Sequence, residues 1–391
     1  MQQSTWFTPD GLEDLLPSQA QKLEYYRRKL MDGFTLSGYD LVLPPLAEFT
    51  DSLLTGTARH MAMDTCCFTD QESGKMMGVR ADMTPQVARI VSNRLKASGQ
   101  ISRLCYAGEV LKTRNNKAKG SRSPIQLGAE LFGHSGVESD IEIIELMLES
   151  MQMLSLKKCK ISLGHVGIVD ELISLAGLDE NQTTQLIDIF ERKALPEYQQ
   201  LLTEITLPDR VVGAFNLLLT LCGEASGVIS QAKAHLSALS PVLKNAIDRL
   251  DTVISFLNTM HSNPIHLDLA DIRGYQYHTG IIFACYSDDG FLLPICKGGR
   301  YDNIGSDFGL ALPATGFSLD LRAALDLLAP VAPVETECVY VSSQADKALQ
   351  KKIVELKLSG VRVVKVFDLS TLISGEKVLV NANGQWVIES V

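Results

Sequence analysis

The sequence lacks several signatures that mark common functional classes. Its eight cysteines form no C-x-x-C pair, although metal sites commonly show that spacing. The longest nearly apolar run, residues 211–223, contains Asn216 and is too short to cross a bilayer. The first residues show no basic segment followed by an apolar one, as a secretory signal requires. We therefore expect a cytoplasmic protein with no metal, no cofactor and no membrane association.

An excess of positive charge is also absent. The formal net charge of the 391 residues is −10, which argues against a nucleic-acid binder, because phosphate contacts supply most of that affinity. Residues 111–124 are the exception, with five basic side chains and no acidic one. This basic segment is either a mobile, solvated hairpin tip or a contact for a phosphate or an acidic partner surface. The sequence leaves both interpretations open.

Apolar periodicity predicts an α+β protein. Leu23, Tyr26, Leu30 and Phe34 recur at helical spacing, which predicts a helix with one buried face. Strands that pair through hairpins and alternate with helices favour a mainly antiparallel sheet. We expect helices at about residues 18–36, 85–95, 137–154 and 167–178, strands at about 101–111, 125–133, 160–166, 264–270, 279–299 and 313–320, and a variable loop before the second helix.

Changes in pattern along the chain predict two domains. A core domain covers residues 1–330 and carries an all-helical insertion at about residues 178–260. Two prolines in residues 329–335 indicate a linker. Residues 331–391 then read as strand, helix, strand and strand, a small α/β domain. Basic and acidic residues balance within that domain, so it has no electrostatic footprint for RNA.

Four segments far apart in the chain place polar residues where a sheet face should be buried. They supply acids for an ammonium group, arginines for a carboxylate, and an acid with aromatic rings for a heteroaromatic ring. That combination is typical of a pocket for a free amino acid. The residues are Arg80, Asp82, Thr84, Gln126, Glu130, Arg273, Tyr275, Tyr277, His278 and Arg300.

Structural interpretations compete with this one. Asp82 is suited to cap the helix that begins near Pro85. Glu130 and Arg273 are suited to form a buried structural ion pair. His165 and His266 fall within strand patterns, which favours core histidines over ligands. The pocket is favoured because the four segments carry complementary groups.

Six segments, in order, resemble motifs of the histidyl-tRNA synthetase family over about residues 5–330. They are "DGLEDLLP…GYDLVLPPLAE", "VRADMT", Tyr106–Gly133, "RGYQYHTGIIF", "GGRYD" and "ATGFSLDLRAAL". The chain is more closely similar to synthetase-like paralogues that serve as regulatory subunits of ATP phosphoribosyltransferase. The resemblance implies a class II aminoacyl-tRNA synthetase-like antiparallel sheet domain and a histidine-binding site. In that site Asp82, Thr84 and Gln126 would hold the amino group, Glu130 the imidazole and Arg273 the carboxylate region, with Tyr277 and His278 at the positions of the family's tyrosine pair.

The chain departs from the synthetases at positions that serve adenylation. Lys112 stands where they have an arginine on the ATP α-phosphate, Arg114 replaces a glutamate, and Ala323 replaces an arginine. Lysine does not reproduce the planar fork of arginine, and the loss of one donor to developing charge typically costs orders of magnitude in rate. We therefore predict a non-catalytic regulatory subunit with no catalytic residues.

The resemblance also implies partners. The chain would form a homodimer within a hetero-octamer with the short-form ATP phosphoribosyltransferase catalytic subunit, without tRNA. It would activate the first step of histidine biosynthesis and relay inhibition by L-histidine, its effector. The alternatives are a divergent histidyl-tRNA synthetase or related amino-acid-activating enzyme, and a stand-alone amino-acid-binding protein.

Overall fold

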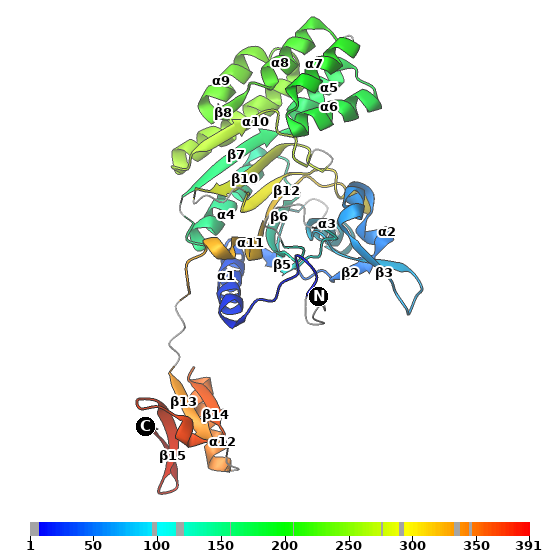
Figure 1. Cartoon of the computed structure of the whole chain (residues 1–391). Helices are drawn as coiled ribbons and strands as arrows, with labels where there is room; N and C mark the ends of the chain where they lie inside the picture. The colour runs from blue at the N-terminus through cyan, green and yellow to red at the C-terminus, as the bar shows by residue number, and fades with distance from the viewer. Residues whose placement is uncertain are drawn as a thin grey trace, which may run out of the picture. The chain divides into compact units, whose positions relative to one another are not determined.

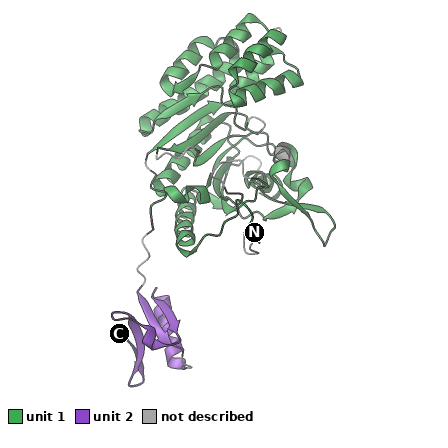
Figure 2. Ribbon diagram, in the orientation of Figure 1, with its two compact units in different colours: residues 1–329 green, residues 330–391 purple. Residues whose placement is uncertain are grey.

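A computed structural model describes residues 8–95, 100–114, 121–156, 158–205, 207–274, 277–288, 293–331, 337–343 and 346–391. The chain divides into two compact units, residues 1–329 and 330–391 (Figure 2). Two features of the sequence prediction, Tyr275 and residues 115–120 of the basic segment, lie outside the described residues.

A nine-stranded sheet forms the centre of the first unit. Its strand order is β1-β5-β6-β12-β11-β10-β7-β9-β8. Neighbouring strands are antiparallel except in the β1–β5 and β7–β9 pairs, so the predicted, mainly antiparallel α+β class is confirmed. The strands are β1 Asp40–Leu41, β5 Ser102–Glu109, β6 Ile125–Phe132, β7 Cys159–His165, β8 Cys222–Glu224, β9 Ile265–Asp268, β10 Ile281–Ser287, β11 Cys296–Arg300 and β12 Ala314–Asp320.

Helices α1 (Pro17–Leu36) and α4 (Val137–Met153) pack against each other and the sheet. Leu30 and Phe34 on α1 are fully buried, as the helical spacing predicts. The predicted helix at residues 85–95 begins as α3 (Thr84–Ile90) and ends in a π-helical turn, Val91–Leu95. Helix α11 (Leu321–Ala324) follows β12 directly.

The segment predicted as a variable loop contains a small sheet instead. Strands β2 (Ala47–Phe49), β3 (Cys66–Thr69) and β4 (Met76–Val79) pair in the order β2-β4-β3. Helix α2 (Thr50–Leu53) and a 3-10 helix, Gly56–Asp64, connect β2 to β3. The loop prediction was wrong because strands this short, largely exposed, leave no clear apolar alternation in the sequence.

The helices of the insertion gather beside the β7-β9-β8 edge of the large sheet (Figure 1). Strand β8 belongs to this segment and pairs with β9, so the prediction of an entirely helical insertion was wrong. Among the described residues, no helix combines the length and apolar character needed to cross a membrane. The helices of the insertion are α6 Glu180–Arg192, α7 Leu195–Glu204, α8 Asp209–Leu218, α9 Ala225–His235 and α10 Pro241–Met260, and α5 Val166–Ala176 precedes it.

The second unit is a four-stranded sheet with one helix. Its strands are β13 Cys338–Ser342, β14 Arg362–Val366, β15 Lys377–Ala382 and β16 Gln385–Ser390, in the order β14-β13-β15-β16, and its helix is α12 Lys347–Leu358. The sequence prediction gave three strands and missed the β15–β16 hairpin. Asn383 and Gly384 form its turn, with φ angles of 53° and 87°, the positive values that two-residue hairpins require.

Candidate functional site

A cavity of about 530 Å³ lies against the middle strands of the large sheet. We call it the inner cavity. Its walls come from β6, β10, β11 and β12, from the residues that precede α3 and from the segment that precedes β10. Its lining includes Asp82, Thr84, Glu130, Arg273, Gly274, Tyr277, His278, Tyr286, Lys297, Tyr301 and Gly316. The structure therefore brings together the residues expected for histidine from the family resemblance, except Gln126, which donates a hydrogen bond to Asp82.

Glu130 is the acid at the base of the inner cavity, and its side chain is 1% exposed. Its carboxyl oxygens are hydrogen-bonded by the hydroxyl groups of Tyr106, at 2.9 Å, and Tyr301. Burial raises the pKa of Glu130 to about 8, even though these hydroxyl groups favour the charged form. At neutral pH this carboxyl group is therefore mostly protonated, and it offers a hydrogen-bond donor as well as acceptors.

Two glycines make room for this arrangement. Gly316 on β12 is the ladder partner of Glu130, and a Cβ atom at Gly316 would overlap the Glu130 carboxyl group. Gly128 is the ladder partner of Tyr106 on β5, and a Cβ atom there would overlap the tyrosine hydroxyl. The polar centre of the sheet thus depends on two positions without side chains.

Asp82 and Gln126 form a second polar group beside Glu130. One oxygen of Asp82 accepts hydrogen bonds from Gln126 Nε2 at 3.0 Å and from the Thr84 backbone N–H at 2.9 Å. Gln126 Oε1 in turn accepts from the Met83 N–H at 2.9 Å. Asp82 therefore lines the cavity and accepts from the N–H of Thr84, the first residue of α3, but the N-cap residue of this helix is Met83. The interpretation of Asp82 as the helix cap was wrong.

The three candidate arginines have different surroundings. Arg80 donates to the backbone oxygens of Glu109 and Pro44, at 2.9 Å each, and so joins the end of β5 to the segment that follows β1. Arg300 is buried and paired with Asp140 on α4 at 2.8 Å. Among the candidate arginines, only Arg273 lines the inner cavity.

Arg273 is bound by its own chain. Its Nε–H donates to Asp271 Oδ1 at 2.9 Å, and its Nη1–H donates to the hydroxyl of Tyr286 at 2.5 Å. Glu130 bonds to tyrosines instead, so the competing interpretation, a structural ion pair between Glu130 and Arg273, was wrong.

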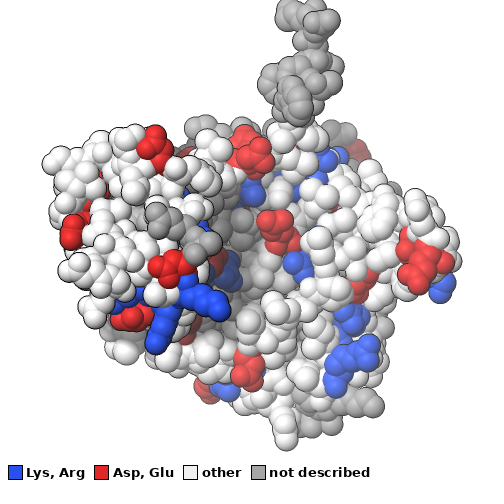
Figure 3. Space-filling model, turned by 90° about the horizontal axis from the view of Figure 1, so that it is seen from below, with Lys and Arg blue, Asp and Glu red and all other residues white. Residues whose placement is uncertain are grey.

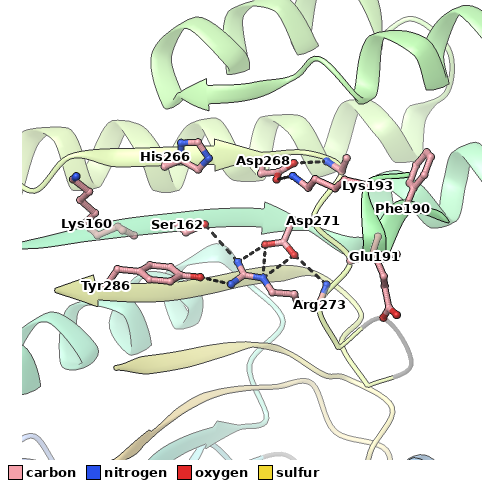
Figure 4. Close-up of a pocket in the computed structure, with 13 residues that line it drawn as sticks. Lys160, Ser162, Phe190, Glu191, Lys193, His266, Asp268, Asp271, Arg273 and Tyr286 are labelled. Carbon is pink, nitrogen blue, oxygen red and sulfur yellow. Dashed lines mark hydrogen bonds and ion pairs between the residues drawn. The ribbon is translucent and has the colours of Figure 1, made fainter. Parts of the chain in front are cut away.

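A second cavity, of about 610 Å³, shares Arg273 with the first. We call it the outer cavity; it lies between the carboxyl end of α6 and strands β7, β9 and β10 (Figure 4). Lys193 pairs there with Asp268. His266 is exposed, with Nε2 3.4 Å from Cys222 Sγ, so its assignment as a core histidine was wrong. His165 is buried, and desolvation lowers its pKa to about 4, as expected of a neutral core histidine.

Four side chains that shape the two cavities were not identified from the sequence. They are Tyr106, Asp271, Tyr286 and Tyr301. Tyr301 stands in the "GGRYD" segment, and Asp271 precedes Arg273 by two residues, so both signals were present. No local sequence signal identifies Tyr106, because only the register of β5 against β6 places it next to Glu130.

The positions that depart from the synthetase motifs make other contacts. Arg114 Nε lies 3.6 Å from an Asp64 carboxylate oxygen. Arg322, the residue before Ala323, donates to the backbone oxygen of Glu13 at 2.8 Å. The Lys112 backbone pairs with Arg122.

Lysine and arginine side chains are interspersed with acidic ones on the face in Figure 3. Within the described residues, no cluster of His, Cys, Asp or Glu is suited to hold a metal ion.

The chain is similar to two groups of known proteins. The family model for histidyl-tRNA synthetase matches residues 11–324. An ATP phosphoribosyltransferase regulatory subunit of Hydrogenovibrio crunogenus is 56% identical over 388 residues, which cover 99% of each chain. That of Chromohalobacter salexigens is 39% identical and covers 98% of each chain. The chain belongs to the family of ATP phosphoribosyltransferase regulatory subunits.

A solved structure supports the fold of this family. It is an ATP phosphoribosyltransferase regulatory subunit/histidyl-tRNA synthetase of Bacillus halodurans, with a TM-score of 0.80 and 24% identity. It covers 94% of this chain and 96% of its own. The predicted class II synthetase-like architecture is therefore confirmed, and the curated relatives are named as regulatory subunits rather than as catalytic ones.

Proposed function

We propose that this chain activates the short catalytic subunit of ATP phosphoribosyltransferase and that its inner cavity binds L-histidine as the inhibitory signal. The enzyme catalyses the first step of histidine biosynthesis, so its end product would report on the pathway. The names of the relatives support the regulatory role, and the chemistry of the cavity lining supports histidine as the ligand.

The chemistry of the inner cavity fits each part of histidine. The protonated carboxyl of Glu130 can donate to an unprotonated imidazole nitrogen, and Tyr277 and Tyr301, with ring centroids 5.2 Å apart, flank that end of the cavity. Asp82, with Thr84 and Gln126 at its side, offers a carboxylate to the α-ammonium group. Arg273 is the cation on the lining for the α-carboxylate, and His278, whose pKa burial lowers to about 4, adds a neutral ring.

One observation carries the proposal. The groups that suit histidine converge on one cavity, whereas Lys112, Arg114 and Ala323 stand where the family's enzymes place groups for adenylation. Arg114 lies against Asp64, and Arg322 donates to the backbone oxygen of Glu13. A retained amino-acid pocket without activation groups is what a sensor needs.

We place the chain in the cytoplasm, as a homodimer within a hetero-octamer with the catalytic subunit. A divergent synthetase or related amino-acid-activating enzyme would use the same cavity with ATP. A stand-alone binding protein would use it without a partner.

Three measurements separate these functions, two on the purified full chain and one after mixing it with the short catalytic subunit. Calorimetric titration with L-histidine should show saturable binding, and ATP–pyrophosphate exchange with histidine should stay at background. Exchange well above background would make the chain an activating enzyme. Histidine binding with no association to the short catalytic subunit on size-exclusion chromatography would make it a stand-alone binder.

A further inference from the structure

The guanidinium group of Arg273 is almost fully occupied before any ligand arrives. Arginine has five N–H donors. The Nε–H and one Nη2–H bond to Asp271, another Nη2–H points to Ser162 Oγ at 3.5 Å, and one Nη1–H bonds to Tyr286 (Figure 4). A ligand carboxylate in the inner cavity therefore finds no free pair of donors for a bidentate contact.

Asp271 is the strongest of these internal partners. Its side chain is 7% exposed, whereas that of Arg273 is 50% exposed. Asp271 Oδ1 also accepts the Arg273 backbone N–H at 3.0 Å, which fixes the carboxylate beside its own arginine. The acid is thus held in place and the arginine is the partner that can move.

We propose, on the basis of the proposed histidine site, that Asp271 and the ligand carboxylate compete for Arg273, so that Asp271 sets the affinity of the inner cavity. Both cavities share Arg273 as part of their walls. A ligand in the inner cavity draws the guanidinium away from Asp271, and an empty inner cavity returns it.

The competition has a consequence for the outer cavity. Asp271 is buried, and a buried carboxylate that loses its cation must find another or take up a proton. The pKa of Lys193, at the carboxyl end of α6, depends in part on the charge of Asp271. Desolvation opposes the charged lysine, but the carboxylates of Asp268 and Asp271 raise its pKa. Occupancy of the inner cavity therefore changes the ion pairs that join the insertion to the sheet.

The test compares L-histidine with histamine, which lacks the carboxylate, on the full chain by calorimetric titration. Asp271→Asn keeps the shape and an oxygen for the Arg273 N–H but removes the competing charge. We expect this variant to bind histidine about fivefold more tightly, which corresponds to the typical contribution of a half-exposed ion pair. We expect it to bind histamine as tightly as the unchanged chain does.

Three outcomes would overturn the inference. If histidine binding is unchanged or weaker while histamine binding is constant, Asp271 only positions Arg273. If both ligands change equally, the substitution distorts the cavity. If histidine does not bind the unchanged chain, the proposed ligand is wrong, and the proposed competition for Arg273 is wrong as well.

Two further variants serve as a control and as an independent test. Asp268→Asn removes a neighbouring acid that pairs with Lys193 rather than Arg273, so it should change the ratio of histidine to histamine affinity less than Asp271→Asn does. Tyr286→Phe removes a different acceptor of Arg273 and should tighten histidine binding alone, by less than Asp271→Asn. It keeps the inference open to refutation even if Asp271→Asn does not fold.

Discussion

Gly316 lies directly opposite Glu130 in the β6–β12 ladder, and the missing side chain at Gly316 admits the Glu130 carboxyl group to the sheet face. An acid that is buried among tyrosines and stays mostly protonated at neutral pH requires this space. The position of Glu130 is therefore set by a residue 186 positions further along the chain, in the last of the six segments that resemble the family's motifs.

Gly316→Ala should abolish histidine binding or weaken it at least about tenfold, because the new methyl group displaces the Glu130 carboxyl and breaks its bond to Tyr301. Titration calorimetry measures the affinity. Gly213→Ala is the matched control, since a Cβ atom at Gly213 on α8 meets nothing within 4 Å. Equal affinities in both variants would show that the Glu130 carboxyl is not part of the site.

The stability of the chain should depend on pH through Glu130. Burial raises the pKa of Glu130 in the folded chain to about 8, from 4.5. The contribution of Glu130 to the free energy of unfolding is therefore fully present below about pH 4.5 and is lost as the pH rises through 8. The free energy falls by at most about 1.4 kcal/mol per pH unit. Glu130→Gln should remove this slope. Denaturant unfolding of both chains between pH 5 and 8.5 measures the difference, and parallel curves would contradict the assignment.

Histidine binding should also weaken above about pH 8. The free imidazole is mostly neutral above its pKa of about 6.5, and a neutral ring carries one N–H donor and one unprotonated nitrogen. The protonated Glu130 carboxyl donates to the unprotonated nitrogen, whereas the ionised carboxylate can only accept, so the ring must turn or change tautomer to bind it and affinity falls. In Glu130→Gln the amide keeps a donor at every pH, so affinity should stay level from pH 7 to 9. Titrations at several pH values test the contrast.

Arg273 and Arg300 should respond differently to substitution. Arg300→Ala leaves the buried Asp140 with one arginine, Arg249, in place of two, and should lower the unfolding free energy by about 3 kcal/mol. Arg273→Ala should cost less stability, because Arg273 is half-exposed, but weaken histidine binding by about tenfold or more. Chemical denaturation and calorimetry on each variant check the assignment, and the reverse pattern would refute it.

Local patterns in the sequence were sufficient for many of the larger elements. The spacing of Leu23, Leu30 and Phe34 predicts α1, and apolar runs predict most strands of the large sheet. The β15–β16 hairpin was missed although Asn383-Gly384 is a strong turn signal, and β2, β3 and β4 were missed because they are short. The strand register that sets Gly316 against Glu130 has no local signature.

The site was predictable as a set of residue types but not as a network. Motif resemblance identified Asp82, Glu130 and Arg273 as neighbours of one cavity. It gave no indication that Glu130 bonds to two tyrosines, because their approach depends on glycines in neighbouring strands. The bond between Arg273 and Asp271 depends on the path of a short loop, which periodicity does not describe.

Reconstitution of the complex tests the central claim most directly. The short catalytic subunit is assayed for ATP phosphoribosyltransferase activity alone, with this chain, and with this chain plus L-histidine, using Glu130→Ala as the comparison. We expect this chain to raise the activity, histidine to lower it, and Glu130→Ala to activate normally while losing sensitivity to histidine by at least about tenfold. Equal histidine inhibition with the unchanged chain and with Glu130→Ala would place the histidine signal outside the inner cavity and contradict the account.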